Sequence, residues 1–462
     1  MGSADPQSIH VLLLPLPILG HINPLLQFGK RLAAHSGVRC TLAMTRFVLN
    51  STKPSPSSVH VAAFSDGCDA GGPDELGGLC ERYAESLESV GSKTLDELLV
   101  QESERGRPVD VVVYDSVMPW AQGVARRRGA ACASFLTQTC AVNVVYAHAW
   151  AGLIPPPPVR PEELPAEFAG LSTQLKVADL PTFLADTNYP MCLREHSINQ
   201  YIGLDTADHV LVNSFYDLEP QEADYMASKW GAKTVGPTVP SAYLDNRIPD
   251  DVSYGIHLHT PMTVEVKDWL DSHAACSVLY VAFGSMASLG LEQMGEIAEG
   301  LFNTNKPFLW VVTSKESSKL PDNFSDKVKE RGLIVPWCQQ LEVLAHPSIG
   351  CFMTHCGWNS TVEALSAGVP MVAMPHWSDQ TTNAKYVQDV WFVGMRIWPD
   401  AKGMVRREEV ERCVREVMDG KRPEQFKKKA SEWSRKVKKA MGKDGSSDIN
   451  ISEFLSKCRC RK

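Results

Sequence analysis

The sequence predicts an α/β protein with two Rossmann-like, doubly wound domains that face a cleft. Its 462 residues exceed the size of one ordinary domain. Short apolar runs alternate with helical patterns, as in parallel α/β architecture. A stretch rich in proline and glycine over 237–262 interrupts this alternation. The content of 44% hydrophobic and 22% charged residues is typical of a globular protein.

The first half of the chain carries several strand–helix repeats. In the first of them, Leu25, Phe28 and Leu32 recur at helical spacing after an apolar run, and Gly37 ends the helix. We expect strands at 10–17, 38–45, 109–115, 130–136 and 209–215, and helices at 23–35, 119–129 and 219–230.

The second half resumes the same alternation after the stretch at 237–262, which we interpret as a linker. We expect strands at 277–283, 308–312, 332–335, 351–354 and 371–373, and helices at 291–303 and 359–367. The predicted parts are an N-terminal domain (1–236), the linker (237–262), a C-terminal domain (263–445) and a tail helix (446–462) that returns to the N-terminal domain.

The charge and the composition indicate which classes of binding partner and which cellular compartment to expect for this protein. The net charge of −8 disfavours a nucleic acid as partner, and the basic run at 426–439 is typical of a solvated helix face. The 13 cysteines lack the paired spacing of a zinc or redox site, which indicates reduced thiols. No stretch reaches the ~20 apolar residues of a membrane span, and the apolar run at 10–18 lacks the flanks of a signal peptide. We therefore expect a cytoplasmic monomer.

A strand–turn–helix pattern near residue 355 is the strongest candidate for a ligand site. An apolar strand ends at Thr354, a turn containing Gly357 follows, and a helix runs over 359–367. The first turn of such a helix presents backbone N–H groups and the positive end of the helix dipole, which favour a diphosphate. His355, Asn359 and Ser360 add side-chain donors, and Glu363 is placed as an acidic partner for ribose hydroxyls.

Taken singly, these residues have simpler interpretations. Asn359 or Ser360 could be helix caps, and Trp337 or Trp358 could be core aromatics. Their joint spacing resembles the donor-binding signature of plant secondary-product glycosyltransferases, in the inverting UDP-glycosyltransferase family. The matching positions are Trp337, Gln340, Leu344, His346, Phe352, His355, Cys356, Gly357, Trp358, Asn359, Ser360, Glu363, Gly368, Val369, Pro370, Pro375, Asp379 and Gln380. The resemblance extends over essentially the whole chain.

This resemblance implies the fold of GT-B type, with an acceptor-binding N-terminal domain and a C-terminal domain that binds the UDP-sugar. It implies that Trp337 stacks on uracil, that the Cys338 backbone bonds the base edge, and that Gln340 and Glu363 hold the ribose. The diphosphate would be bound by His355, Gly357, Asn359, Ser360 and Ser285. The sugar hydroxyls would be bound by Trp358, Asp379 and Gln380, of which Gln380 favours glucose. UDP-glucose is then the co-substrate, with neither a cofactor nor a metal.

His21 and Asp115 are the candidate catalytic pair. His21 follows the first predicted strand, and Asp115 closes the strand at 109–115. A histidine with an unperturbed pKa of ~6.5 can take a proton from a hydroxyl if a partner orients it. The alternative is that both are ordinary turn residues. The resemblance implies that His21 is the general base and Asp115 its partner, in an inverting displacement that yields a β-glucoside.

One position departs from the family pattern, and the acceptor stays open. Leu19 stands where the family usually has a polar residue, which predicts a more apolar acceptor pocket or weaker activity. The segments 114–120 and 243–248 resemble the subgroup acting on small phenolic acids, thiohydroximates, auxin-like acids and trichothecenes. Three candidate pocket residues are equally suited to the core: Phe135, His148 and Tyr189.

Rival functions lack their motifs. There is no Gly-X-Ser-X-Gly of a serine hydrolase and no Gly-X-Gly-X-X-Gly of a dehydrogenase. A nucleotide-sugar-binding protein with little or no turnover stays the alternative to an enzyme.

Overall fold

The computed structural model describes residues 8–52, 54–55, 57–256, 263–419 and 421–461. The chain divides into two compact units. Unit 1 comprises residues 1–177, 183–258 and 439–462, and unit 2 comprises 178–182 and 259–438. The predicted linker, 237–262, ends with residues 257–262, which lie outside the described residues. Its residues 237–256 belong to unit 1. The predicted domain limits stay a proposal.

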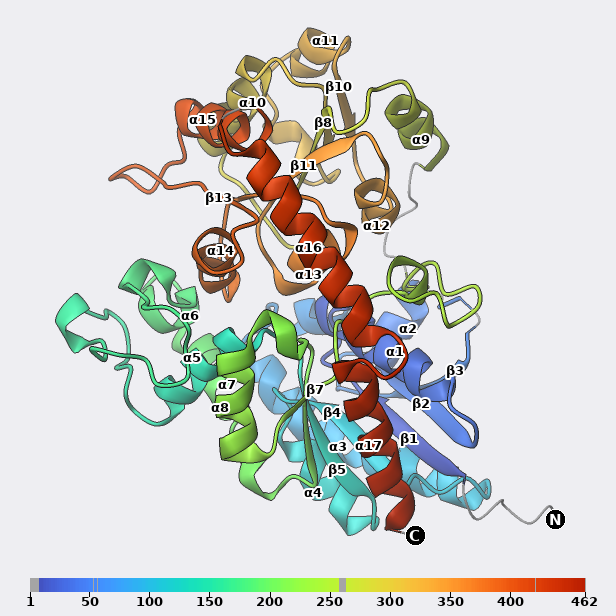
Figure 1. Cartoon of the computed structure of the whole chain (residues 1–462). Helices are drawn as coiled ribbons and strands as arrows, with labels where there is room; N and C mark the ends of the chain where they lie inside the picture. Colours follow the sequence, from blue (N-terminus) through green and yellow to red (C-terminus); the bar gives the residue numbers. More distant parts are fainter. Residues whose placement is uncertain (1–7, 53, 56, 257–262, 420, 462) are drawn as a thin grey trace. The chain divides into compact units, whose positions relative to one another are not determined.

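Unit 1 is built on a seven-stranded parallel sheet with the order β3-β2-β1-β4-β5-β6-β7 (Figure 1). Its strands are β1 (Ile9–Leu14), β2 (Val38–Thr45), β3 (Val59–Phe64), β4 (Val111–Asp115), β5 (Ala131–Leu136), β6 (His209–Val212) and β7 (Lys233–Thr234). The chain first adds β2 and β3 on one side of β1 and then adds β4 to β7 on the other side. The strand order therefore reverses between β1 and β4, which is where doubly wound sheets bind ligands.

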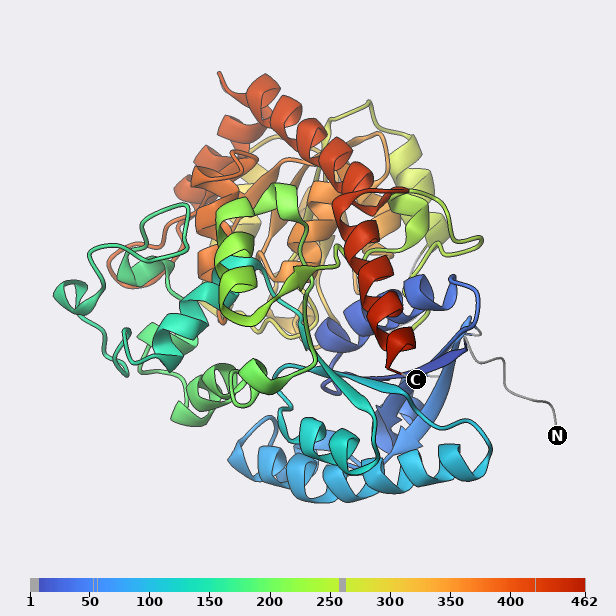
Figure 2. The ribbon, with the colours of Figure 1, turned by 60° about the horizontal axis from the view of Figure 1, so that its bottom comes forward.

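Helices cover both faces of this sheet. They are α1 (Leu19–Ala33), α2 (Arg46–Thr52), α3 (Glu81–Glu104), α4 (Trp120–Arg127), α5 (Cys140–Trp150), α7 (Met191–Asn199), α8 (Pro220–Trp230) and α17 (Ser446–Cys460), with α6 (Thr182–Ala185) beginning in unit 2. Figure 2 shows α3 along one face and α1 and α17 on the other. Alternate strand residues serve the two faces: Leu12 and Leu14 pack in the cluster of α3 and α4, whereas Phe135 packs on Phe28 of α1.

Unit 2 repeats the same plan with a six-stranded parallel sheet of order β10-β9-β8-β11-β12-β13 (Figure 1). Its strands are β8 (Val278–Ala282), β9 (Phe308–Val311), β10 (Gly332–Val335), β11 (Ile349–Thr354), β12 (Met371–Ala373) and β13 (Gly394–Arg396). Its helices are α9 (Thr263–Asp271), α10 (Leu291–Asn303), α11 (Phe324–Val328), α12 (Gln340–Leu344), α13 (Trp358–Ala367), α14 (Gln380–Asp389), α15 (Arg407–Met418) and α16 (Pro423–Met441). Here the order reverses between β8 and β11.

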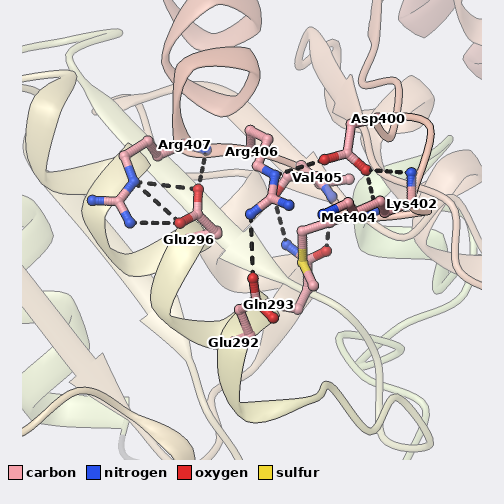
Figure 3. Close-up of polar contacts among 9 residues, drawn as sticks. All are labelled: Glu292, Gln293, Glu296, Asp400, Lys402, Met404, Val405, Arg406 and Arg407. Atoms are coloured by element: carbon pink, nitrogen blue, oxygen red, sulfur yellow. Dashed lines mark hydrogen bonds and ion pairs between the residues drawn. The ribbon is translucent and has the colours of Figure 1, made fainter.

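A set of polar contacts joins α10 to the start of α15 (Figure 3). Gln293 donates to the Val405 carbonyl at 2.9 Å and accepts from the Val405 N–H at 3.0 Å. Arg407 pairs with Glu296, and Arg406 pairs with both Asp400 and Glu292. Exposed ion pairs contribute little to stability. The two Arg406 pairs are exposed, so the reciprocal Gln293–Val405 bonds and the pair between Arg407 and the nearly buried Glu296 fix this segment on α10.

Each predicted strand and helix has an observed counterpart, with one difference that affects the candidate site. The first helix begins at Leu19 and not near Asn23, because the N–H groups of His21 and Ile22 both donate to the Ile18 carbonyl. His21 therefore lies in the first turn of α1 and not in a free turn after β1. No helix in the described part of the chain combines the length and the apolar character needed to cross a bilayer.

Candidate active site

The predicted catalytic pair of unit 1 lies at the carboxyl ends of β1 and β4. Because β1 and β4 are neighbouring parallel strands, their carboxyl ends lie side by side at the reversal of the strand order. Asp115 is the last residue of β4, and His21 follows β1 in the first turn of α1. The topology thus explains how two residues 94 positions apart in the sequence come into contact.

His21 and Asp115 form a short hydrogen bond. The distance from His21 Nδ1 to Asp115 Oδ2 is 2.6 Å. Asp115 is fully buried, while the His21 side chain keeps 20% of its surface exposed. The carboxylate also accepts from the backbone N–H groups of Leu16 at 3.2 Å and Val117 at 3.4 Å. Since a carboxylate accepts from Nδ1, the proton of the neutral ring belongs on Nδ1 and the lone pair on Nε2. This is the arrangement that a general base requires.

Three further residues near this pair were not identified from the sequence. Thr137, one residue after β5, has its Oγ1 3.4 Å from His21 Nδ1. His196 of α7 interacts electrostatically with both Asp115 and His21, and burial lowers the pKa of its imidazole. Gln200, one turn after His196, accepts a bond from Ser116 at 3.0 Å. The folded chain brings α7 and the end of β5 close to the end of β4. These segments are far apart in the sequence, so no local sequence pattern could have indicated the three residues.

In unit 2, the predicted donor residues gather at the carboxyl edge of the sheet. The segments after β8, β10, β11 and β12 contain Ser285, Trp337–Gln340, His355–Ser360 and Asp379–Gln380, respectively. Because all strands of the sheet are parallel, these segments emerge at the same edge. The parallel sheet therefore accounts for the grouping of residues spread over 96 positions, from 285 to 380.

The turn between β11 and α13 holds His355 against two glycines. A Cβ placed on Gly357 would lie 2.5 Å from His355 Nε2, and one on Gly284 would lie 2.9 Å from the same atom. Gly357 is also the N-cap of α13, where it supplies no side-chain bond to the first turn. Asn359 and Ser360 lie within α13, so neither is its cap. The backbone N–H groups at this helix end are placed as anion donors.

His355 is a neutral group. Burial, together with the nearby His376 ring, lowers the pKa of His355 to about 3. Its Nδ1 is buried and has no hydrogen-bond partner among the described residues. A buried ring nitrogen without a partner is rare and costly. A neutral imidazole seated at a helix N-terminus can still donate one N–H to an anion.

A hydrogen-bonded cluster joins α12 to α13. The Gln340 amide donates to Ser360 Oγ at 2.9 Å and to Glu363 Oε2 at 2.7 Å. The Tyr280 hydroxyl donates to Gln340 Oε1 at 3.3 Å, and its ring stacks on Phe352. The structure thus brings together the two predicted ribose residues, Gln340 and Glu363. Tyr280 was not identified from the sequence, because a tyrosine within an apolar strand gives no separate signal.

The remaining predicted donor residues differ in exposure. Asp379 accepts a bond from Asn383 at 2.7 Å, and Asn383 also donates to the Cys356 carbonyl at 2.9 Å. Gln380 Oε1 accepts from the N–H groups of His376 and Trp377. The exposure of the others is as follows: Trp337 is half-buried, Cys338 and Trp358 are buried, and Ser285 is exposed. The Trp358 ring packs on Trp391.

Two of the three candidate pocket residues belong to the core. Phe135 is fully buried in β5, and His148 Nε2 bonds the Ala169 carbonyl at 2.8 Å. Tyr189 is half-buried and packs on Phe183. Among the described residues, no group of three or more His, Cys, Asp or Glu side chains is arranged to hold a metal ion.

Known proteins resemble this chain over nearly its whole length. The family model for "UDP-glucoronosyl and UDP-glucosyl transferase" matches residues 237–436. The barley UDP-glucosyltransferase UGT13248 is 49% identical over 453 residues, which cover 97% of this chain and 94% of the relative. The rice UDP-glycosyltransferase 79 is 48% identical over 460 residues, with 98% of both chains covered.

A solved structure extends the similarity to three dimensions. Os79 from rice in complex with UDP superposes with a TM-score of 0.92 at 47% identity, covering 97% of this chain and 100% of that one. The predicted α/β class with two Rossmann-like units of GT-B type is therefore confirmed. The chain belongs to plant family 1 of the UDP-glycosyltransferases, enzymes for which a UDP-sugar is the co-substrate.

Proposed function

We propose that this enzyme transfers glucose from UDP-glucose to a hydroxyl of a small apolar acceptor and forms a β-glucoside. A carboxyl or thiol is the alternative nucleophile. The observation that carries the proposal is the bond of 2.6 Å between His21 and a fully buried Asp115 at the reversal of the unit 1 sheet. A buried carboxylate that orients a partly exposed imidazole is the arrangement of a general base.

In the proposed reaction, His21 Nε2 accepts the proton of the acceptor hydroxyl. The acceptor oxygen forms a bond to C1 of glucose from the face opposite the phosphate. The bond between C1 and the phosphate oxygen breaks, and its electron pair leaves with UDP. One displacement inverts the anomeric centre. Asp115 holds the imidazole in place and stabilises its positive charge while the proton is transferred.

Unit 2 supplies the donor site in this proposal. Trp337 stacks on uracil, and the Cys338 backbone bonds the base edge. Gln340 and Glu363 are joined at 2.7 Å and hold the ribose hydroxyls. The first turn of α13, with His355, Gly357, Asn359 and Ser360, binds the diphosphate together with Ser285. The helix dipole and these donors stabilise the charge on departing UDP, so the mechanism requires no metal. Trp358, Asp379 and Gln380 bind the sugar.

We base the proposed class of acceptor on a similar protein of known structure and on one residue near His21. A rice structure is described as a complex of Os79 with a trichothecene, at 47% identity to this chain. In this protein, Leu19 is the first residue of α1 and is half-buried. An apolar side chain two residues before His21 favours an apolar acceptor. We propose trichothecenes and small phenolic acids as the first acceptors to examine. Cytoplasmic location and a monomeric state stay predictions.

The test is to incubate the purified protein with UDP-glucose and a panel of trichothecenes, phenolic acids and thiohydroximates, with and without a chelator. We expect UDP release, a glucoside detected by mass spectrometry, and β configuration by NMR, unchanged by the chelator. An α-glucoside would contradict the single displacement, and loss of activity with the chelator would contradict the metal-free mechanism. Binding of UDP without product across the panel would favour the nucleotide-sugar-binding alternative.

A further inference from the structure

A short segment from the first half of the sequence is built into unit 2. Residues 178–182, which we name the strap, belong to unit 2, whereas the residues on both sides of it belong to unit 1. The strap runs from Ala178 through Asp179, Leu180 and Pro181 to Thr182. It lies against β13 and the start of α14, the helix that begins at Gln380.

One end of the strap is anchored by a buried ion pair. Arg396 of β13 pairs with Asp179 at 2.7 Å, and the two side chains are only 5% and 3% exposed. The same guanidinium donates to the Ala178 carbonyl at 2.8 Å. A charge pair buried this far is strongly destabilising to break, because removal of one partner leaves the other charge unpaired. This end of the strap is therefore an anchor.

The middle of the strap bonds the first turn of α14. Thr381 Oγ1 donates to the Leu180 carbonyl at 2.6 Å, and Thr382 Oγ1 donates to the Asp179 carbonyl at 2.7 Å. Both threonines directly follow Gln380. The strap thus fixes the helix whose first residue is a proposed sugar ligand.

The other end of the strap holds the residue that precedes the proposed sugar ligands. Thr182 N–H donates to the Ser378 carbonyl at 2.9 Å, and Thr182 Oγ1 accepts from Ser378 N–H at 2.7 Å. Ser378 has a φ of +59°, a conformation that residues other than glycine adopt at some cost. Such a conformation persists only when its surroundings enforce it. The two bonds to Thr182 are contacts that do so, immediately before Asp379.

We propose that the strap is a part of the donor-sugar site, in which Thr182 positions Asp379 and Gln380 for the hydroxyls of the hexose. This inference rests on the proposed function, because it assigns the sugar to Asp379 and Gln380. Thr182 is a positioning residue and does not itself touch the donor. Uridine and diphosphate binding use Trp337, Gln340 and His355, which follow other strands. Loss of the Thr182 hydroxyl should therefore weaken the contribution of the sugar to binding and leave that of UDP unchanged.

The experiment is calorimetry of UDP and of UDP-glucose on the full chain and on three variants. Thr182→Val removes the hydroxyl at nearly constant volume, and Thr182→Ser retains it. Thr304→Val is the matched control, because the Thr304 hydroxyl also accepts from a backbone N–H, that of Lys306, and donates to the Leu301 carbonyl at 2.7 Å. Thr304 follows α10 and precedes β9, so it lies at the amino edge of the sheet, away from the donor residues.

For Thr182→Val we expect the Kd of UDP-glucose to rise about fivefold, the typical effect of one lost hydrogen bond, while the Kd of UDP changes less than about twofold. Thr182→Ser and Thr304→Val should bind both ligands as the wild type does. An unchanged ratio of the two Kd values in Thr182→Val, whether both rise or neither does, would overturn the positioning role. Failure of the wild-type protein to bind UDP would instead overturn the proposed function.

Discussion

Each unit places a histidine at the reversal of its strand order, and the two histidines have different surroundings. His21 follows β1 beside β4, and His355 follows β11 beside β8, so each lies where its strand order reverses. His21 bonds a fully buried carboxylate. His355 lies against Gly284 and Gly357, and the nearest titratable group that affects it is another imidazole. The fold sets the location, and the neighbouring residues set the chemistry.

This difference separates two tasks that an imidazole can perform. In the proposed mechanism, the carboxylate of Asp115 stabilises the positive charge that His21 gains with the proton. The surroundings of His355 oppose protonation and hold its pKa at about 3, so at neutral pH the ring is uncharged and has one N–H that it can donate to an anion. We infer that His21 serves proton transfer and that His355 serves binding of an anion.

The largest effect is expected from His21→Ala. Loss of a general base typically lowers the rate by about a thousandfold, and we expect a decrease of that size in kcat/KM with the best acceptor of the panel. His60→Ala, at an exposed position of β3 in the same unit, is the control and should behave as the wild type. If His21→Ala kept near wild-type rates on an unactivated alcohol, the assignment of the base would be wrong.

A smaller loss is expected from Asp115→Asn, which keeps the shape and removes the charge. We expect kcat/KM to fall about a hundredfold, because the amide neither stabilises the imidazolium nor enforces a proton on Nδ1. The Kd of UDP, measured by calorimetry, should stay unchanged. A variant with full activity would show that Asp115 has only a structural role.

Gly357→Ala tests whether UDP binding depends on the position of the His355 ring in unit 2. Its Cβ would lie 2.5 Å from His355 Nε2, so the ring must move, and we expect UDP to bind about tenfold more weakly. Gly290→Ala is a close match, since Gly290 is also an N-cap with extended backbone and has open space around its Cβ position. Equal UDP affinity in the two variants would contradict the proposed role of the turn.

The smallest effect concerns stability and pH. An unfolded histidine titrates near 6.5, whereas His355 titrates at about 3 in the folded chain. Between these values the unfolded state binds the extra proton, so the stabilisation present above about pH 6.5 is lost as the pH falls. Urea unfolding followed by tryptophan fluorescence, at about pH 7 and about pH 5.5, should show a loss about 1 kcal/mol larger for the wild type than for His355→Gln. Equal losses would contradict a neutral His355.

Much of the fold could be predicted from the sequence, because most strands of the two parallel sheets are buried. Such strands appear as continuous apolar runs, and the predicted ranges 291–303, 332–335 and 371–373 coincide with α10, β10 and β12. The long helix α3 was not predicted, since its hydrophobic residues are sparse among charged ones. The predicted start of α1 is too late. Proline is common in the first turn of a helix, which favours a helix that begins near Pro24, whereas α1 begins at Leu19 and contains Pro24 five residues later.

The candidate site could be predicted only in part. Residues that lie close together in one segment, such as His355 to Glu363, form a local pattern that the sequence displays directly. Contacts that depend on how distant segments pack leave no such pattern. Thr137, His196 and the bond between Thr182 and Ser378 are of this second kind. The contact between His21 and Asp115 could be anticipated because the ends of parallel strands converge.

We infer that His21 transfers a proton and that His355 binds an anion. The most direct test of these two roles is to measure UDP binding by calorimetry for His21→Ala and His355→Gln side by side. We predict that His21→Ala binds UDP with the wild-type Kd although it has lost transfer, and that His355→Gln binds UDP about tenfold more weakly. The opposite pattern, with weak binding in His21→Ala and unchanged binding in His355→Gln, would contradict the account.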